Sequence, residues 1–295
     1  MLPSVCILTT VWNQVDKTLA CLATLTQLGY PNYHILLIDN GSSDDTVAQV
    51  SAKFPQVEVI QLPENLGFAG GYNVGLRRAI DQEYDTIFVL NNDTLVEPDA
   101  LSRLVETAVS DPNIGMVTAK IYYNAERNRI WSLGGQIHPW TLEIVEDAND
   151  QIDDGSWTEP LDLDFAPLCA VLLRRALLEE VGLFDEAFFL YYEDMDFARR
   201  VRQAGYRIVL EPKAIIYHDV SASSGGRYSP NERYWMARSS VIYFRKQAKP
   251  LNWLAILPWR TASALKMTIR LLRLGKTAAL QAYWRGLWHG IKEEL

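Results

Sequence analysis

Short apolar runs alternate with segments of helical periodicity through the first 110 residues of the chain. The runs "SVCILTT", "HILLID", "VEVIQL" and "TIFVLN" have the length and the β-branched content of buried strands. The segments between them predict helices over residues 15–28, 44–54 (with Ser43 or Asp44 as cap) and 70–80, and Pro98 opens a further helix. Continuous apolar strands separated by helices predict a parallel sheet that is covered on both faces.

The second half of the chain is less regular before the pattern resumes. Residues 121–167 contain the acidic, turn-rich stretch "NDQIDDGSWTEP". From "CAVLLRR" onward we expect a strand, a short helix, the loop "GLFDEAFFLYYED", a helix to Ala204 and the strand "YRIVLEP". The stretch "HDVSASSGGRYSP" reads as a loop of small residues, and helical patterns fill the remainder. The expected organisation is one large α/β domain followed by a helical extension.

The composition is typical of a globular protein, but the charge is distributed unevenly between the two ends of the chain. The chain has 295 residues, of which 48% are hydrophobic and 22% charged, so it can bury a sizeable core. The net charge of −8 combines 18 basic and 5 acidic residues from Arg199 onward with 10 basic and 31 acidic residues before it. The two ends therefore face different partners. The basic end carries no nucleic-acid-binding motif, which favours an anionic membrane surface over nucleic acid.

The cysteines and the apolar segments indicate the compartment. Cys6, Cys21 and Cys169 are few and have apolar neighbours, which is typical of reduced, packed thiols in a cytosolic protein. The N-terminal residues lack the features of a signal peptide. The most apolar long segment, residues 251–274, is interrupted by Pro258 and by basic residues, so we expect a protein that is soluble or lies on a membrane without crossing it.

Polar side chains follow the predicted strands where the carboxyl ends of the strands meet. Residues 9–13, 39–43 and 91–93 would share this edge, where ligands of parallel sheets collect. Asn91, Asn92 and Asp93 suit a hard divalent cation if a diphosphate completes its shell, although an Asx turn would use the same residues. Asp39 is either an acceptor for a nucleotide or part of a turn and helix cap.

Two further segments and His218 each allow a structural and a functional interpretation. The glycines of "ENLGFAGGYNVG" do not fit a dinucleotide fingerprint, so they serve either close approach to a bulky anionic ligand or helix packing. Glu193, Asp194 and Asp196 either complement a helix dipole or provide a general base in an aromatic cleft. His218 follows an apolar strand and is either a ligand or a hydrogen-bonded residue.

The order of these motifs is more specific than any one of them. The stretches "VCILTTVWN", "LLIDNGSSDDT", "ENLGFAGGYNVG", "LNNDT", "GLFDEAFFLYYEDMDFARRVRQAGYRI" and "YHDVSAS" together resemble family 2 glycosyltransferases over residues 3–248. The likeness is closest to bacterial rhamnosyltransferase-like and galactofuranosyltransferase-like members. It implies the GT-A fold, with a Rossmann-like nucleotide-binding half over about residues 1–120 and an acceptor-binding half over about 121–248. Residues 249–295 would form a basic amphipathic helical tail.

The resemblance also implies a role for individual residues. Thr9 and Asn13 would line the nucleoside pocket, Asp39 would hydrogen-bond a pyrimidine base, and Asn65, Gly67 and Gly71 would flank the nucleotide and the sugar. The D-x-D motif of the family falls on Asn91, Asn92 and Asp93, with an asparagine in place of the first acid.

The remaining roles concern the metal and the chemistry. Asp93 and His218 would hold Mg²⁺ or Mn²⁺, Asp194 would be the catalytic base, and Glu193 would orient the site. Tyr234 and Arg238 match a helix position that reaches the donor side.

The expected activity is inverting transfer of a sugar, rhamnose or similar, from a dTDP- or UDP-sugar to a hydroxyl of a lipid-linked or polysaccharide acceptor in cell-surface glycan synthesis. Two alternatives remain at this point. A sugar-nucleotide nucleotidylyltransferase would need a basic glycine-rich loop after the first strand, and "TTVWNQ" provides none. A catalytically inactive sugar-nucleotide-binding protein is the second alternative, and the presence of Asp39, Asp93, Asp194 and His218 argues against it. The sequence is also compatible with a homo-oligomer.

The basic tail predicts the location of the protein in the cell. Lys266, Arg270 and Arg273 share one helical face, and Leu265, Ile269 and Leu272 share another. The tail also carries the tryptophans Trp253, Trp259, Trp284 and Trp288. We expect an interfacial anchor that holds the protein on the inner face of the cell membrane, while a solvated helix packed on the domain is the alternative.

Overall fold

A computed structural model describes residues 2–146, 148–219, 226 and 228–295. Most of the small-residue loop that was expected after His218 therefore lies outside the described residues. The strands are β1 (Val5–Val11), β2 (Tyr33–Asp39), β3 (Glu58–Gln61), β4 (Thr86–Asn91), β5 (Thr94–Val96), β6 (Ile114–Tyr123), β7 (Glu126–Ser132), β8 (Gln136–Ile137), β9 (Ile144–Val145), β10 (Leu161–Leu163), β11 (Ala170–Arg174) and β12 (Arg207–His218). The helices are α1 (Val15–Leu25), α2 (Thr46–Lys53), α3 (Gly67–Asp81), α4 (Ala100–Ser110), α5 (Arg175–Val181), α6 (Glu193–Gln203), α7 (Pro230–Gln247), the 3₁₀ turn η1 (Pro250–Asn252), α8 (Trp253–Arg273) and α9 (Thr277–Lys292).

One large sheet organises the chain. Its strand order is β10-β12-β6-β11-β4-β1-β2-β3, with β5 paired to β12 and β7 to β6. The four apolar runs of the N-terminal part form the parallel segment β3-β2-β1-β4, as their sequence predicts. The sheet is mixed rather than purely parallel, because β11 lies antiparallel between β4 and β6. The expected division at about residue 120 falls inside β6, which is one continuous strand.

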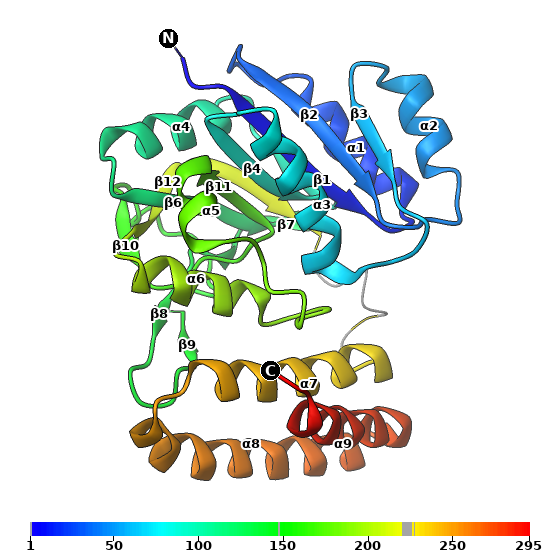
Figure 1. Cartoon of the computed structure of the whole chain (residues 1–295), viewed down its shortest axis with the longest axis vertical. Helices are drawn as coiled ribbons and strands as arrows, with labels where there is room; N and C mark the ends of the chain where they lie inside the picture. Colours follow the sequence, from blue (N-terminus) through cyan, green and yellow to red (C-terminus); the bar gives the residue numbers. More distant parts are fainter. Residues whose placement is uncertain (1, 147, 220–225, 227) are drawn as a thin grey trace.

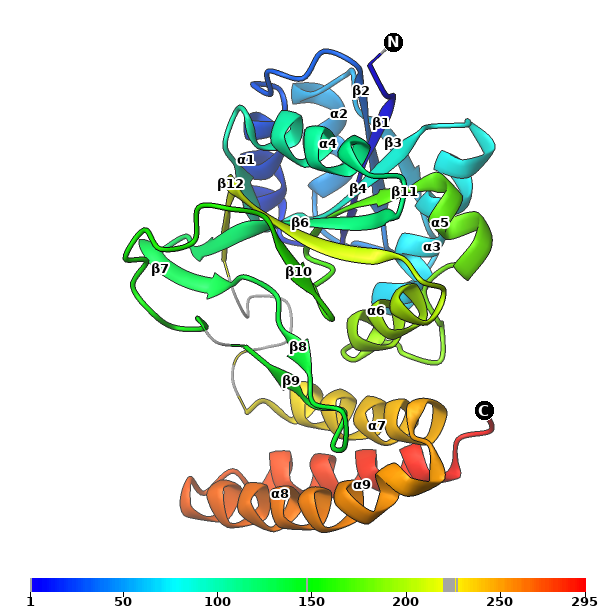
Figure 2. The same cartoon turned by 90° about the vertical axis from the view of Figure 1, so that its left-hand side faces the viewer.

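Helices cover both faces of this sheet (Figures 1 and 2). The side chains of β1 alternate between the faces: Val5 and Ile7 pack in one cluster with α1, α2 and α4, whereas Cys6 and Leu8 pack in the other with α3, α5 and α6. All three cysteines are free and buried, which confirms the packed thiols expected from the sequence. Burial raises the pKa of the Cys6 and Cys21 thiols to about 12.

Glycines allow α3 to approach the sheet closely. A Cβ atom at Gly75 would lie 2.2 Å from Leu8 Cδ1, and one at Gly71 would lie 2.8 Å from Asn40 Nδ2. These two glycines therefore serve helix packing, the structural alternative that the sequence left open. The helix begins at Gly67, three residues before the expected start.

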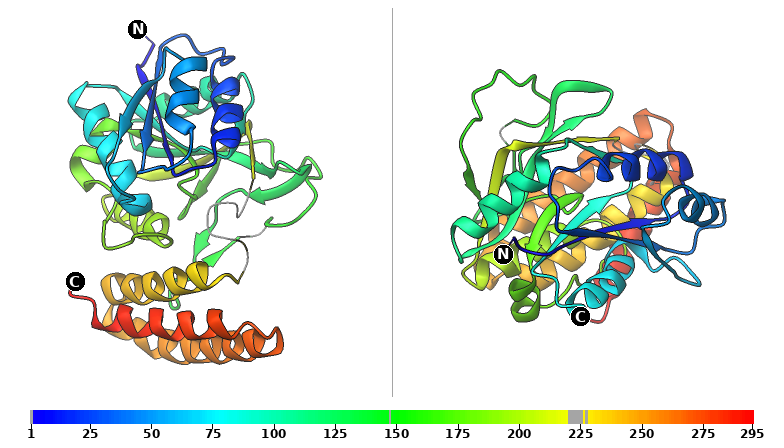
Figure 3. Two further views of the ribbon diagram at one scale, coloured as in Figure 1. Left: turned by 90° about the vertical axis from the view of Figure 1, so that its right-hand side faces the viewer. Right: turned by 90° about the horizontal axis from the view of Figure 1, so that it is seen from above.

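The C-terminal helices form a separate layer below the α/β domain. Figure 3 shows α7 between that domain and the pair α8 and α9. The contact of α9 with α7 is close, because a Cβ atom at Gly286 would lie 2.3 Å from the Tyr234 carbonyl oxygen. Among the helices that the structure describes, none combines the length and the apolar composition that a membrane crossing requires.

Candidate functional site

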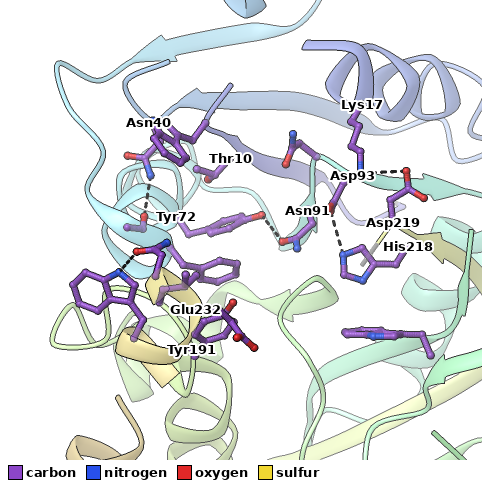
Figure 4. A pocket seen from close by; sticks show the side chains of 18 of the residues that line it. Thr10, Lys17, Asn40, Tyr72, Asn91, Asp93, Tyr191, His218, Asp219 and Glu232 are labelled. Carbon is purple, nitrogen blue, oxygen red and sulfur yellow. Dashed lines mark hydrogen bonds and ion pairs between the residues drawn. The ribbon is translucent and has the colours of Figure 1, made fainter. Parts of the chain in front are cut away.

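A pocket of about 1290 Å³ opens at the carboxyl ends of β1, β2 and β4 (Figure 4). We call it the main pocket. Its walls come from the sheet edge, the start of α3, the β6–β7 hairpin, the loop before α6 and the first turns of α7. Loops that cross a sheet at the carboxyl ends of its parallel strands commonly form ligand sites. The sequence-predicted residues that line it are Asn65, Gly67, Asn91, Asn92, Asp93 and His218.

Asp93 and His218 meet at the floor of the main pocket. The antiparallel pairing of β5 with β12 places His218 opposite Thr94, next to Asp93. Asp93 Oδ1 lies 3.1 Å from His218 Nε2, and both side chains are buried (Figure 4). The indole ring of Trp131 packs edge-on against the imidazole, with a centroid distance of 4.7 Å. His218 Nδ1 has no hydrogen-bond partner among the described residues.

This pair fits a divalent cation whose shell is completed by a ligand. The described residues contain no group of three or more His, Cys, Asp or Glu side chains suited to a metal. A carboxylate and an imidazole are both metal ligands, and Mg²⁺ is usually bound by one or two protein groups together with substrate phosphates. The donor set of Asp93 and His218 is therefore adequate with a diphosphate and inadequate alone.

The two asparagines before Asp93 are held by neighbouring helices. The Tyr72 hydroxyl lies 2.9 Å from the Leu90 carbonyl oxygen and 3.3 Å from Asn91 Oδ1. Asn92 Nδ2 donates to Thr18 Oγ1 at 3.0 Å. Both asparagines thus line the pocket in fixed orientations.

Asn40 fixes the loop that leads into α3. Its amide nitrogen donates to the Gly67 carbonyl oxygen at 2.9 Å and to Asn65 Oδ1 at 3.1 Å, and its oxygen accepts from the Leu66 N–H at 2.9 Å. Sequence reasoning did not single out Asn40, although it directly follows Asp39 at the end of β2. The three hydrogen bonds order one wall of the main pocket.

The main pocket is not lined by four residues that were expected on the nucleotide side, namely Thr9, Asn13, Asp39 and Gly71. Thr9 is buried, and the neighbouring Thr10 lines the pocket in its place. Asp39 is also buried and accepts the Ser42 N–H at 3.1 Å, while Asn13 Oδ1 accepts the Ser43 N–H at 2.9 Å. Both side chains shape the turn after β2. Gly71 packs against Asn40, as described above.

Gly67 occupies a position that disfavours any side chain. Its φ is +76°, and a Cβ atom would lie 2.4 Å from the Phe189 carbonyl oxygen. The Phe68 N–H donates to this same oxygen at 2.7 Å and joins the α3 loop to the loop before α6.

We expect Gly67→Ala to cost about 1–3 kcal/mol of unfolding free energy, because it combines backbone strain with a steric clash. It should also weaken nucleotide binding. The matched control is Gly182→Ala, which has a similar φ of +84° and no heavy atom within 4 Å of the added Cβ. Thermal melts of both variants measure the difference, and equal losses would contradict a role for the Phe189 contact.

Glu193 and Asp194 begin α6, where Glu193 is buried and Asp194 is half-buried. The residues before them, Tyr191 and Tyr192, adopt left-handed φ angles of 67° and 69°. Burial raises the pKa of Asp194 to about 6, although its carboxylate accepts the Met195 N–H at 2.8 Å. Burial and the adjacent charge of Asp194 hold the pKa of Glu193 well above its ordinary value. A pair of carboxyl groups with different affinities for the proton is typical of acid–base sites.

The third acid of the α6 start has a structural role. Asp196 accepts from Arg200 Nε at 2.9 Å and from Gln247 Nε2 at 2.6 Å, so it ties α6 to α7. Neither Glu193 nor Asp194 lines the main pocket, which is reached from this loop by Leu190 and Tyr191.

The helix α7 reaches the main pocket with other residues than expected. Arg238 donates to the Ala187 carbonyl oxygen at 2.9 Å and pairs with Glu293 at 2.7 Å, and the Tyr234 hydroxyl meets His289 Nδ1 at 2.8 Å. Both side chains therefore hold the C-terminal helix in place. The residues of α7 that line the main pocket are Asn231, Glu232 and Trp235.

Exposed aromatic and charged side chains at the mouth were also missed. Trp12 directly follows β1 and is 46% exposed. The sequence shows this tryptophan directly after a predicted strand, which could have marked it as a candidate for the site. Lys17 and Asp219 also line the pocket and form an ion pair of 3.3 Å near Asp93 (Figure 4).

Comparison with known proteins identifies relatives in sequence. Residues 6–182 match the family model described as "Glycosyl transferase family 2". The chain is 24% identical over 298 residues to an N-acetylglucosaminyl-diphospho-decaprenol L-rhamnosyltransferase of Mycobacterium tuberculosis, with 92% of each chain covered. It is 27% identical to a poly-beta-1,6-N-acetyl-D-glucosamine synthase of Staphylococcus aureus over 78% of this chain and 53% of that protein.

Solved structures share the fold at low identity. The structure of GalNAc-T7 with UDP, GalNAc and Mn²⁺ matches with a TM-score of 0.64 at 15% identity, over 85% of this chain and about half of that one. The mannosyltransferase PcManGT from Pyrobaculum calidifontis, in complex with GDP-Man and Mn²⁺, matches with a TM-score of 0.61 at 18% identity, over all of this chain and 77% of that one. The GT-A fold expected from the sequence is confirmed.

Proposed function

The chain belongs to glycosyl transferase family 2, and we propose that it is a metal-dependent, inverting enzyme that acts on a nucleoside-diphosphate sugar. Sugar transfer itself follows from the family, and this decides against the nucleotidylyltransferase alternative. The donor, the acceptor and the mechanism are proposals. The observation that carries the use of a metal with a nucleoside-diphosphate sugar is the Asp93–His218 pair at the floor of the main pocket. Two residues 125 positions apart meet there with a metal-binding donor set.

The main pocket would bind the metal ion, and the first residues of α6 would provide the catalytic base. Asp93 and His218 would hold Mg²⁺ or Mn²⁺, with Asn91 and Asn92 beside them. A bound cation would neutralise the negative charge of the departing diphosphate.

Asp194 would accept the proton of the acceptor hydroxyl. A pKa of about 6 leaves its carboxylate ionised at neutral pH and more basic than an exposed aspartate. Glu193, whose pKa is raised by burial and by the adjacent charge of Asp194, would orient the site. With no enzyme nucleophile proposed, a single displacement inverts the anomeric centre.

The proposed donor is a dTDP- or UDP-sugar, and the proposed sugar is rhamnose or a similar hexose. The similarity to an N-acetylglucosaminyl-diphospho-decaprenol L-rhamnosyltransferase supports a lipid-linked acceptor. The similarity to a poly-beta-1,6-N-acetyl-D-glucosamine synthase supports a glycan acceptor as the second candidate. Thermal shift with a panel of nucleotide sugars tests the donor. We expect stabilisation by one nucleotide class only when Mg²⁺ or Mn²⁺ is present, since ligands that bind the native state raise the melting temperature. Stabilisation that is equal in a chelator would contradict the metal site.

We further propose that α8 and α9 hold the protein on an anionic membrane. One face of α8 packs inward through Ile256 and Leu271. Another face, the apolar face of α8, is exposed to solvent and comprises Leu254, Leu257, Leu265, Ile269 and Leu272. Leu254 is 75% and Leu265 60% exposed, and these positions follow helical spacing.

Charge and aromatic residues beside this face suit a lipid surface. Lys266, Arg270 and Arg273 flank the apolar face of α8, and Trp284 and Trp288 are exposed on α9. Cations near an anionic leaflet contribute about 1 kcal/mol each, and tryptophans favour headgroup depth. Arg260 is excluded from this role because it donates to Ser240 at 2.7 Å and meets Glu143 at 3.4 Å.

The variant Leu265→Glu/Ile269→Glu tests the anchor without removing helices that pack on α7. We expect the wild type to float with anionic vesicles at low salt and the variant to remain in the bottom fraction, because two charges replace exposed apolar side chains that would enter the membrane. Val109→Glu is the control, since Val109 is 52% exposed on α4. Equal flotation of all three proteins would contradict the membrane as partner. So would a wild type that does not float but forms a dimer, if the double variant is monomeric.

A further inference from the structure

A second, smaller cavity lies between α7, α8 and α9. Its volume is about 260 Å³, and we call it the basic pocket. It is lined by Tyr192, Met236, Met267 and Tyr283 and by the cations Arg233, Arg260, Lys266 and Arg270, while no carboxylate is among the described residues that line it. A concave site with converging cations is suited to a phosphate or diphosphate group.

Only part of this positive charge is neutralised by the protein. Arg233 pairs with Glu232, and Arg260 meets Glu143 at 3.4 Å. Arg270 donates to the Tyr228 hydroxyl at 2.8 Å, which is a neutral partner. Within the described part of the chain, neither Lys266 nor Arg270 has a carboxylate at ion-pair distance. The basic pocket therefore retains the charge of about two cations for a ligand.

The basic pocket adjoins the main pocket through a shared wall. Tyr191 and Glu232 line the main pocket, and the residues that directly follow them, Tyr192 and Arg233, line the basic pocket. The left-handed backbone at Tyr191 and Tyr192 directs consecutive side chains into different cavities. Because Tyr192 also directly precedes Glu193 and Asp194, a ligand held in the basic pocket lies beside the start of the helix that carries the proposed base.

The other side of the basic pocket adjoins the apolar face of α8. Lys266 and Arg270 line the pocket, and each is next in sequence to an exposed member of that face, Leu265 and Ile269. A ligand with an anionic head in the pocket could therefore extend an apolar chain along the helix. The arrangement fits one molecule with a sugar, a phosphate group and a lipid chain in this order.

We propose that the basic pocket binds the diphosphate of a lipid-linked acceptor, with the lipid chain on the apolar face of α8 and the acceptor sugar directed toward Asp194. This inference rests on the proposed function, because it assigns the acceptor class of that site. It gives Lys266 and Arg270 a role in substrate binding beyond attraction to a membrane.

Geranyl diphosphate, titrated calorimetrically without membranes, is the probe. Saturating UDP and Mg²⁺ keep diphosphate groups out of the main pocket. We expect binding by the wild type and at least about tenfold weaker binding by Lys266→Glu, because a charge-assisted contact becomes a repulsive one. The matched control is Arg273→Glu, which makes the same charge change on the same helix outside the basic pocket. We expect its affinity within about twofold of the wild type.

Inorganic diphosphate and geraniol separate the two halves of the ligand. We expect each to bind more weakly than geranyl diphosphate. Inorganic diphosphate that binds as tightly would identify a free-phosphate site and overturn the proposal. So would equal losses in Lys266→Glu and Arg273→Glu, or no binding of geranyl diphosphate by the wild type.

Hydrolysis of nucleotide sugars by the wild type distinguishes this inference from the proposed function. If no nucleotide sugar is hydrolysed but the titrations follow the expected order, the proposed function fails and the basic pocket stands as a lipid diphosphate site.

Discussion

Replacing Asp194 by asparagine is expected to lower turnover by about a hundredfold or more while the affinity for the nucleotide sugar stays near the wild-type value. The asparagine side chain has nearly the same shape but cannot accept the hydroxyl proton. Single-turnover kinetics together with donor titrations measure the two quantities separately.

The raised pKa of Asp194 makes two pH-dependent results expected. Turnover of the wild type should rise with pH through about 6, as the carboxylate ionises. Because the folded-state pKa lies above the ordinary 3.8, folding favours the protonated form, and the wild type loses stability as the pH rises from about 4 to about 6. Asp194→Asn should therefore be more stable than the wild type at pH 7, by up to about 3 kcal/mol.

Glu193→Gln is the companion variant. It should retain more activity than Asp194→Asn, since Glu193 is proposed to orient the site and Asp194 to accept the hydroxyl proton. A strong loss in Glu193→Gln with an unaffected Asp194→Asn would reverse the two roles.

Replacing Asp93 by alanine is expected to abolish turnover. The change removes the only carboxylate that meets His218 at the floor of the main pocket among the described residues. We expect binding of Mn²⁺ in the presence of UDP, followed by electron paramagnetic resonance, to weaken by at least about tenfold. The melting temperature should fall only modestly, because a single buried hydrogen bond is lost, at about 1–3 kcal/mol.

Asn91→Asp is the control for Asp93. It restores the acid that the family motif has at this position, and the site should tolerate it. An Asp93→Ala variant with full activity in chelator-treated buffer would contradict the metal site.

The sequence was sufficient for the parallel part of the sheet. Residues 86–91 form a strand with the expected bounds, because a short apolar run rich in β-branched residues favours a buried strand over a helix. The antiparallel position of β11 could not be predicted, since its apolar pattern carries no direction. The strands β8, β9 and β10 have only two or three residues each, too few to show an alternation of apolar and polar positions.

The site depended on contacts that no local pattern encodes. The three-residue strand β5 brings Asp93 to His218 through its pairing with β12, so only the family resemblance placed them together in advance. A one-residue shift separates Thr9 from the pocket-lining Thr10, because successive strand residues face opposite sides. On α7, the packing of α9 determines that Trp235 and not Arg238 lines the main pocket.

The most direct test is acceptor-free hydrolysis of a panel of nucleotide sugars, followed by proton NMR fast enough to record the first anomer released. We predict that one sugar is released only with Mg²⁺ or Mn²⁺, with the anomeric configuration opposite to that of the donor, and that Asp194→Asn slows this release. Release that is equally fast in a chelator, or that gives the configuration of the donor, would contradict a metal-dependent inverting glycosyltransferase.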